Sequence, residues 1–389
     1  MNCFYCESNE IEKFKLNENL LDASDFHEPK QELNRYSYFV ESCKTCGHSA
    51  ISTNNPCWLP TRKYDFITYG EPTEHYPMIL LTLRSLNLNF KDVSIHTFSY
   101  KDIKLATFLS NELNISEINL NDHAGCSDDW LPLVSSEVIR RTPLAFARFL
   151  NEIDNSKKSH QLILMTRFFD HVASRDLLRQ VLGLSSPNRH FVFDLNDYDQ
   201  LFKLGTVEFI WNERRNLFRR SHLESIFQKN NLKHLMFEYA SYEVSPTLTG
   251  IISERLPNAR YPYQENLVEL PASNLIDELK SLRLRWQNTL AADNKLAIIG
   301  ASHKGVSLAQ FILANEVQYS LHDDKQALKG KTPPIDPPLG FYTVSGFDFS
   351  EYTHIAITTT LVIAAKIITK LRASGYTGEI LDFDCKRLD

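Results

Sequence analysis

Four cysteines near the N-terminus are the residues of this chain whose types and spacing most clearly specify chemistry. Cys3 and Cys6 form one Cys-x-x-Cys pair, and Cys43 and Cys46 form a second. Such a turn directs two thiolates at one point, and two turns complete the tetrahedral sulfur shell that suits zinc. Gly47 follows the second pair, where the turn needs a positive φ. We therefore predict a structural zinc site, closed by four cysteines and without an open position for catalysis.

Two other interpretations of these cysteines are unrelated reduced thiols and a redox pair. A redox pair needs no partner pair, which disfavours that interpretation. The segment between the pairs is longer than in common zinc ribbons, so a small folded loop must bring them together. The remaining cysteines of an odd total of seven are expected to be core or surface thiols: Cys57, Cys126 and Cys385.

The composition of the chain argues against some classes of function. The chain has 389 residues, is 43% hydrophobic and 23% charged, and carries a net charge of -6. The composition is that of a globular protein, and the chain is long enough for two or three domains. The acidic balance argues against nucleic-acid binding. We see neither a leader-like N-terminus nor an apolar run of membrane-spanning length, so we expect no membrane partner and a cytoplasmic location.

The elements that must position a site alternate between strand and helix, which is typical of a parallel α/β layer. In the middle of the chain, strands are expected at Val93–Phe98, Gln161–Met165 and His190–Asp194. Helices are expected at 76–88, Lys101–Leu113, Leu144–Ile153, Arg175–Leu182 and 221–229, with Ser221 as the cap of the last. Beyond the prolines of 256–271, the expected elements are a helix at Ser273–Asn288, strands at Lys295–Ile299, Tyr319–His322 and Ile355–Thr358, and a helix at Val306–Leu313.

This order of parts resembles the bacterial sugar C-methyltransferases over nearly the whole chain. The resemblance implies an α/β fold: a zinc-binding module (1–60), a Rossmann-like methyltransferase domain (61–256) and a second Rossmann-like α/β domain (272–389). It implies methyl transfer from S-adenosylmethionine to a carbon of a nucleotide-linked keto-deoxysugar or a related small molecule. The expected cofactors are therefore structural zinc and S-adenosylmethionine.

The C-terminal motifs carry the most specific part of the resemblance. The family has a strand, a Gly-Ala-x-x-Lys-Gly turn and a helix, and here the turn reads Gly300-Ala-Ser-His-Lys-Gly305. Its backbone N–H groups and Lys304 predict an anion site facing the middle domain. Asp323, at the next strand end, could accept hydrogen bonds from a sugar or ribose hydroxyl. The predicted substrate-binding residues are Gly300, Ala301, Ser302, Lys304 and Asp323; the alternative is that the glycines serve packing alone.

The predicted catalytic residues come from the middle domain. His171 closes a segment that matches the family after an apolar strand, and it is the predicted base, because its ordinary pKa lies near neutrality. Glu213 would assist it, and Arg214 would place a positive charge beside an enolate oxygen. The alternatives are a buried structural histidine, an ion pair of Glu213 with Arg214 or Arg215, and an arginine cluster that is either a solvated helix face or a clamp for a diphosphate.

The cofactor loop departs from the family. Where the family has a Gly-x-Asn-Asp-Gly loop, this chain has a segment from His96 to Asp102 in which Phe98 replaces small residues. Only Asp102 survives, and it is the predicted cofactor-binding residue. Three hypotheses follow: methyl transfer with an altered site, different chemistry on the same fold, or a non-catalytic partner of an active paralogue.

Overall fold

The computed structural model describes most of the chain, in segments that exclude several loops. The described residues are 2–21, 35–53, 73–121, 139–142, 153–155, 158–172, 175–204, 206–207, 209–210, 214–239, 246–256, 275–290, 294–300, 303–313, 318–324, 335, 341–359 and 361–388. Glu213, Ala301 and Ser302 lie outside them, as does nearly all of the helix expected at Leu144–Ile153. The predicted domain boundaries near residues 60 and 272 also fall outside, and the domain limits stay predictions.

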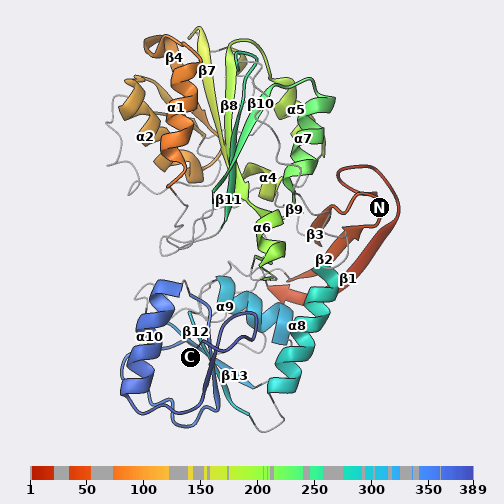
Figure 1. The fold of residues 1–389 in the computed structure, drawn as a ribbon, viewed down its shortest axis with the longest axis vertical. Helices are drawn as coiled ribbons and strands as arrows, with labels where there is room; N and C mark the ends of the chain where they lie inside the picture. The colour runs from red at the N-terminus through yellow and green to blue at the C-terminus, as the bar shows by residue number, and fades with distance from the viewer. Residues whose placement is uncertain are drawn as a thin grey trace.

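The N-terminal module is an antiparallel sheet in the order β1-β2-β3-β9 (Figure 1). Its first three strands are β1 (Ile11–Leu21), β2 (Arg35–Cys43) and β3 (Ser49–Thr53). Pairing of Ile11 with Cys43 brings the first cysteine turn next to the second. The fourth strand, β9 (Asn216–Leu217), comes from the middle of the sequence and pairs with β3.

The central domain is built on a seven-stranded sheet. In chain order its strands are β4 (Val93–Thr97), β5 (Ile118–Asn121), β6 (Ile139–Thr142), β7 (His160–Thr166), β8 (Arg189–Asn196), β10 (His234–Tyr239) and β11 (Thr247–Ile252). They lie in the order β6-β5-β4-β7-β8-β11-β10. The first five are parallel and follow the Rossmann order 3-2-1-4-5. Strand β11 is antiparallel to both of its neighbours. This is a Rossmann-like α/β fold, as the sequence predicted.

Helices cover both faces of this sheet (Figure 1). The helices α1 (Tyr76–Ser85) and α2 (Ile103–Leu113) share a core with Ile95, Leu164 and Val192. On the opposite face lie α4 (Phe168–His171), α5 (Arg175–Gly183) and α7 (Arg220–Lys229). Alternate residues of β7 and β8 therefore point to opposite cores, as strand geometry requires. Helix α6 (Tyr198–Lys203) follows β8 directly.

The prediction that Ser221 caps α7 is wrong. The helix begins at Arg220, and Arg219 takes the N-cap position. The backbone N–H of Arg219 donates to Nδ1 of His222 at 3.3 Å, so a ring nitrogen satisfies this helix end.

The C-terminal domain has a second parallel sheet in the order β14-β13-β12-β15-β16. Its strands are β12 (Leu296–Ile299), β13 (Tyr319–His322), β14 (Phe341–Tyr342), β15 (His354–Ile357) and β16 (Glu379–Leu381). Its helices are α8 (Leu275–Thr289), α9 (His303–Ser307), the π-helical turn η4 (Leu308–Leu313) and α10 (Leu361–Ala373). The helix expected at Val306–Leu313 thus begins earlier, at His303. In chain order this sheet also reads 3-2-1-4-5.

The N-terminal sheet and the C-terminal domain share one hydrophobic core. Tyr38 and Val40 of β2 are fully buried in the same cluster as Leu279 and Phe311. The rings of Tyr38 and Phe311 have centroids 5.6 Å apart. Arg283 of α8 donates to the carbonyl oxygen of Leu16, which ties the edge of β1 to the domain. In the described part of the chain, no helix has both the length and the apolar character needed to cross a bilayer.

Candidate active site and metal centre

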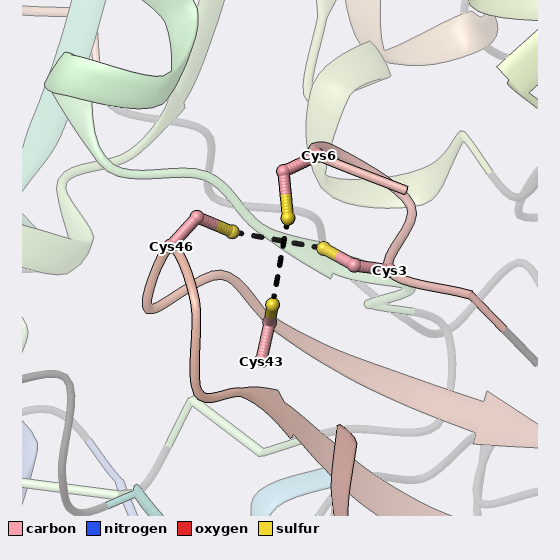
Figure 2. Close-up of side chains that lie close together, drawn as sticks. All are labelled: Cys3, Cys6, Cys43 and Cys46. Atoms are coloured by element: carbon pink, nitrogen blue, oxygen red, sulfur yellow. Dashed lines mark hydrogen bonds between the residues drawn. The ribbon is translucent and has the colours of Figure 1, made fainter. Parts of the chain in front are cut away.

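The four predicted cysteines meet at one point (Figure 2). Their sulfur atoms all lie within 4.8 Å of one another. The Sγ atoms of Cys3 and Cys46 are 3.7 Å apart, and those of Cys6 and Cys43 are 3.5 Å apart. Tetrahedral zinc with bonds of about 2.3 Å places its sulfur ligands about 3.8 Å apart. A disulfide requires about 2.05 Å, and all four thiols are free. The donor set and its spacing therefore fit zinc.

Both cysteine turns are closed by backbone hydrogen bonds. The N–H of Gly47 donates to the carbonyl oxygen of Cys43 at 2.9 Å, and Gly47 has a φ of 71° as predicted. The N–H of Tyr5 points at the sulfur of Cys3 at 3.4 Å. Contact with the thiol of Cys46 lowers the pKa of Cys3, and the same contact raises the pKa of Cys46.

Polar contacts from Arg175 and His222 hold the metal centre against the central domain. Arg175, at the start of α5, donates through Nε to the carbonyl oxygen of Phe4 at 2.8 Å and also bonds the carbonyl oxygen of Cys3. The Nε2 atom of His222 in α7 is 2.9 Å from the carbonyl oxygen of Cys46. A closed sulfur shell held this way stabilises the arrangement of domains and performs no chemistry.

A second group of titratable residues lies at the carboxyl edge of the central sheet. His171 ends α4, which follows β7, and it is 3% exposed. Its Nε2 atom is 3.0 Å from Nζ of Lys101, which lies in the short helix η2 (Tyr100–Asp102) after β4. Strands β4 and β7 are the neighbours at which the strand order reverses, where open α/β sheets bind ligands. The structure therefore places His171, the predicted base, at this edge of the sheet and in contact with a lysine.

Asp102, the predicted cofactor-binding residue, is fully buried and closes the loop after β4. Its Oδ2 accepts from the backbone N–H groups of Phe98 at 2.8 Å and Ser99 at 2.9 Å. Its Oδ1 accepts from the N–H of Thr166, at the end of β7, at 2.6 Å. Burial raises the pKa of Asp102 to about 7, although the hydrogen bonds from Ser99 and Thr166 oppose the shift. The carboxylate therefore joins two loops, and its acceptor positions are occupied by backbone groups.

The path of this loop differs from a glycine-rich loop. Positive φ values among the described non-glycine residues do not include any residue from 93 to 102. Phe98 is 1% exposed, and its ring packs on Phe168 with centroids 5.2 Å apart. Backbone N–H groups that a glycine loop would offer to a cofactor are donated to Asp102 instead. The loop does not fit the glycine-loop mode of binding S-adenosylmethionine.

A buried network of charge continues along the same edge. Arg167, held at a φ of 59°, has Nε 3.5 Å from Oδ1 of Asp194 and Nη1 3.9 Å from Oδ2 of Asp170. Tyr198 donates its hydroxyl to Asp170 at 2.9 Å. Nε2 of His75 is 3.5 Å from Oδ2 of Asp194, and neither ring nitrogen of this fully buried histidine has a hydrogen-bond partner among the described residues.

Arg214 lies in this neighbourhood, whereas Arg219 and Arg220 do not. Burial raises the pKa of Asp170, and the charges of Arg167 and Arg214 oppose that shift. Arg214 is therefore near enough to Asp170, the residue before His171, for its charge to act on that carboxylate. In contrast, Arg219 is 3.8 Å from Asp199, and Arg220 bonds Glu224 at 3.0 Å and Glu238 at 2.9 Å. Because both arginines form ion pairs with acidic side chains, they do not support the interpretation of this cluster as a clamp for a diphosphate.

Of the predicted substrate-binding residues, Gly300, Lys304 and Asp323 are described, and they lie at the carboxyl edge of the C-terminal sheet. Gly300 follows β12, and its N–H donates to the carbonyl oxygen of His322 at the end of β13 at 3.0 Å, so Asp323 lies close by. Gly300 has a φ of 93°, and a Cβ there would lie 2.6 Å from Cγ2 of Thr359. A Cβ on Gly305 would lie 2.6 Å from the carbonyl oxygen of Gly300. Packing by itself thus demands both glycines, while Lys304 and Asp323 remain beside the turn.

Lys101 is the residue that sequence reasoning missed. It directly precedes Asp102, and the resemblance drew attention to the glycines lost from that segment rather than to the lysine gained. A usable signal was present in the topology. Loops that follow adjacent parallel strands meet at one edge, so a lysine after β4 and a histidine after β7 are brought together.

Comparisons with known proteins find similar solved structures over part of the chain. No family model matches the sequence, and no curated protein matches it. The methyltransferase domain of bacterial CtHen1 is 13% identical over 46% of this chain and 97% of its own, with a TM-score of 0.33. A SAM-dependent methyltransferase from Anabaena variabilis is 16% identical over 46% of this chain and 84% of its own, with a TM-score of 0.32. The magnesium protoporphyrin IX methyltransferase of Synechocystis, solved with bound SAH, is 8% identical over 48% and 90%, with a TM-score of 0.32.

Proposed function

We propose that this chain is an S-adenosylmethionine-dependent C-methyltransferase-like protein that acts on a nucleotide-linked keto-deoxysugar or a related small molecule. The observation that carries the proposal is the 3.0 Å contact between Nζ of Lys101 and Nε2 of His171, at the switch point of a Rossmann-like sheet. A histidine can remove a proton next to a ketone, and a nearby ammonium group can stabilise the enolate that forms.

In the proposed reaction, Nζ of Lys101 leaves Nε2 of His171 for the ketone oxygen of the substrate, and the freed lone pair of Nε2 takes a proton from the carbon beside the ketone. The electron pair of that C–H bond moves into the enolate, whose oxygen carries the developing negative charge. Lys101 places a positive charge at that oxygen, and Arg214 adds a second charge nearby. S-adenosylmethionine, when bound, supplies an electrophilic methyl group. Because the loop at Phe98 does not fit the glycine-loop mode, the residues of this chain support the proton transfer more directly than the binding of the methyl donor.

A second candidate function is a non-catalytic partner of an active paralogue. The closed loop favours it, since Phe98 and Ser99 donate their N–H groups to Asp102. The burial of His171 points the same way, because the ring reaches a substrate only when part of this edge moves.

Solvent deuterium exchange separates the two candidates. The full chain is incubated in D2O with a nucleoside-diphosphate-linked keto-deoxysugar, and mass spectrometry follows exchange at the carbon beside the ketone. The proposal expects exchange above the buffer rate, its loss in His171→Asn, and addition of one methyl group when S-adenosylmethionine is present. His190→Asn, at the opposite edge of the same sheet, is the matched control and should exchange normally. Absence of exchange and of methyl transfer in the wild-type protein would favour the non-catalytic partner.

A further inference from the structure

The two-residue strand β9 touches the metal-binding module on one side. Leu217 pairs with Ser49 and Asn216 pairs with Ala50, both in β3. The N–H of Ile51 donates to the carbonyl oxygen of Arg215 at 3.1 Å, which extends the pairing by one residue. A strand of the central domain is therefore an integral part of the sheet that carries the cysteines.

On its other side, β9 holds the end of α4. The N–H of Arg215 donates to the carbonyl oxygen of Asp170 at 2.6 Å. The side-chain Nδ2 of Asn216 donates to the carbonyl oxygen of Val172. These two carbonyl groups flank His171, so consecutive residues of one strand fix the backbone on both sides of the predicted base. Arg215 is 8% exposed and Asn216 is 1% exposed, so water does not readily replace either bond.

The start of β3 is set by the second cysteine turn. The N–H of Cys43 donates to the carbonyl oxygen of His48 at 2.9 Å, and Ser49 begins β3 at the next residue. A metal bound by Cys43 and Cys46 closes this turn, because the ion fixes both thiolates at one point. A continuous series of contacts therefore runs from the thiolates through β3 and β9 to the backbone of His171.

We propose that zinc binding positions His171 through β9, with Asn216 as the positioning residue. The inference rests on the proposed function for the role of His171, but the positional claim concerns this chain alone. Loss of zinc opens the second cysteine turn, weakens the pairing of β3 with β9, and frees the carbonyl groups on either side of His171. The consequence is a base that is misplaced while the central sheet stays folded.

The first test follows the imidazole signals of the full chain by NMR after histidine labelling, with the His171 signal assigned from His171→Asn. Removal of zinc with a chelator should displace the His171 signal, and addition of zinc should restore it. The signal of His190, at the opposite edge of the sheet and bonded to Ser253 at 2.8 Å, should not move. An unmoved His171 signal in folded, zinc-free protein would overturn the proposal.

The second test keeps zinc in place, so it decides the matter even where the zinc-free chain unfolds. Asn216→Leu preserves size but removes the donor to Val172. It should retain zinc, displace the His171 signal, and lower the turnover rate of deuterium exchange about 10²-fold with little change in KM. Arg175→Gln is the control, because it removes the hydrogen bonds to the carbonyl groups of Cys3 and Phe4 without touching β9. It should leave the His171 signal in place.

The outcomes separate this inference from the proposed function. A normal His171 signal in Asn216→Leu, or a displaced signal in Arg175→Gln alone, contradicts the route through β9. If the wild-type protein exchanges no substrate proton while zinc removal still displaces His171, the positional inference stands and the proposed function fails.

Discussion

The carboxylate of Asp102 offers a quantitative test, because structure and resemblance assign it different roles. In the structure, this side chain joins the loops after β4 and β7, because it accepts hydrogen bonds from the buried backbone N–H groups of Phe98, Ser99 and Thr166. Leaving a buried donor unsatisfied costs about 1–3 kcal/mol. Asp102→Ala abandons all three donors, so at pH 5 we expect a loss of about 3–6 kcal/mol, with some relaxation of the loop. Asp102→Asn keeps the shape and one acceptor, and should lose about 1–3 kcal/mol.

The assay for this prediction is native-state hydrogen exchange at the amides of β4 and β7. It reports the free energy of opening of the central sheet separately from the other parts of a multi-domain chain. Isothermal titration with S-adenosylmethionine is run on the same variants. The contrary result is that Asp102→Ala changes the opening free energy by less than about 0.5 kcal/mol, as ordinary surface substitutions do, and abolishes cofactor binding. That result would refute the role of Asp102 as the link between the two loops.

Four further predictions follow from the site. Metal analysis should find about one zinc per chain, and Cys43→Ser should lose it and unfold the N-terminal module; a disulfide within either pair would contradict this. The pKa of Asp102 is raised to about 7 in the folded state, so the stability that this side chain contributes is fully present below the pKa of an aspartate in the unfolded chain and is lost as the pH rises through 7. Between pH 5 and 8, the free energy of unfolding of the wild-type protein should therefore fall by about 2–3 kcal/mol relative to that of Asp102→Asn. Parallel curves of unfolding free energy against pH would refute the raised pKa. Lys304→Ala should weaken binding of a nucleoside-diphosphate sugar, whereas unchanged affinity would mean that the turn is structural. S-adenosylmethionine should bind with a Kd of hundreds of micromolar or weaker, which is a binding free energy of about -5 kcal/mol. Low-micromolar affinity would contradict the conclusion that the loop at Phe98 does not fit this cofactor.

Local patterns predicted the metal centre and the layered fold well. Cys-x-x-Cys pairs encode their geometry within a single turn, so the four ligands could be named without knowledge of the path between them. Apolar runs such as 161–165 and 296–299 mark buried parallel strands because both of their faces are covered. For the same reason, the strands expected at Lys295–Ile299 and Ile355–Thr358 correspond to β12 and β15.

Features that depend on distant partners could not be read from the sequence. Strand β9 has two residues and no pattern of its own, and it exists because β3 offers an unpaired edge. The role of Asp102 depends on Thr166, which lies in another loop and meets it only when β4 pairs with β7. Ser221 looked like a helix cap because it is a favoured residue type, but the ring of His222 satisfies the helix end instead.

If Lys101 and His171 form the proton-transferring pair, the rate of deuterium incorporation into a keto-deoxysugar substrate depends on both side chains. The decisive comparison is between the wild-type protein and Lys101→Met, a variant of similar length without the ammonium group. Loss of a preorganised charge at a developing oxyanion lowers a rate about 10²–10³-fold, and we expect that loss here. A Lys101→Met protein that incorporates deuterium at the wild-type rate would contradict the claim.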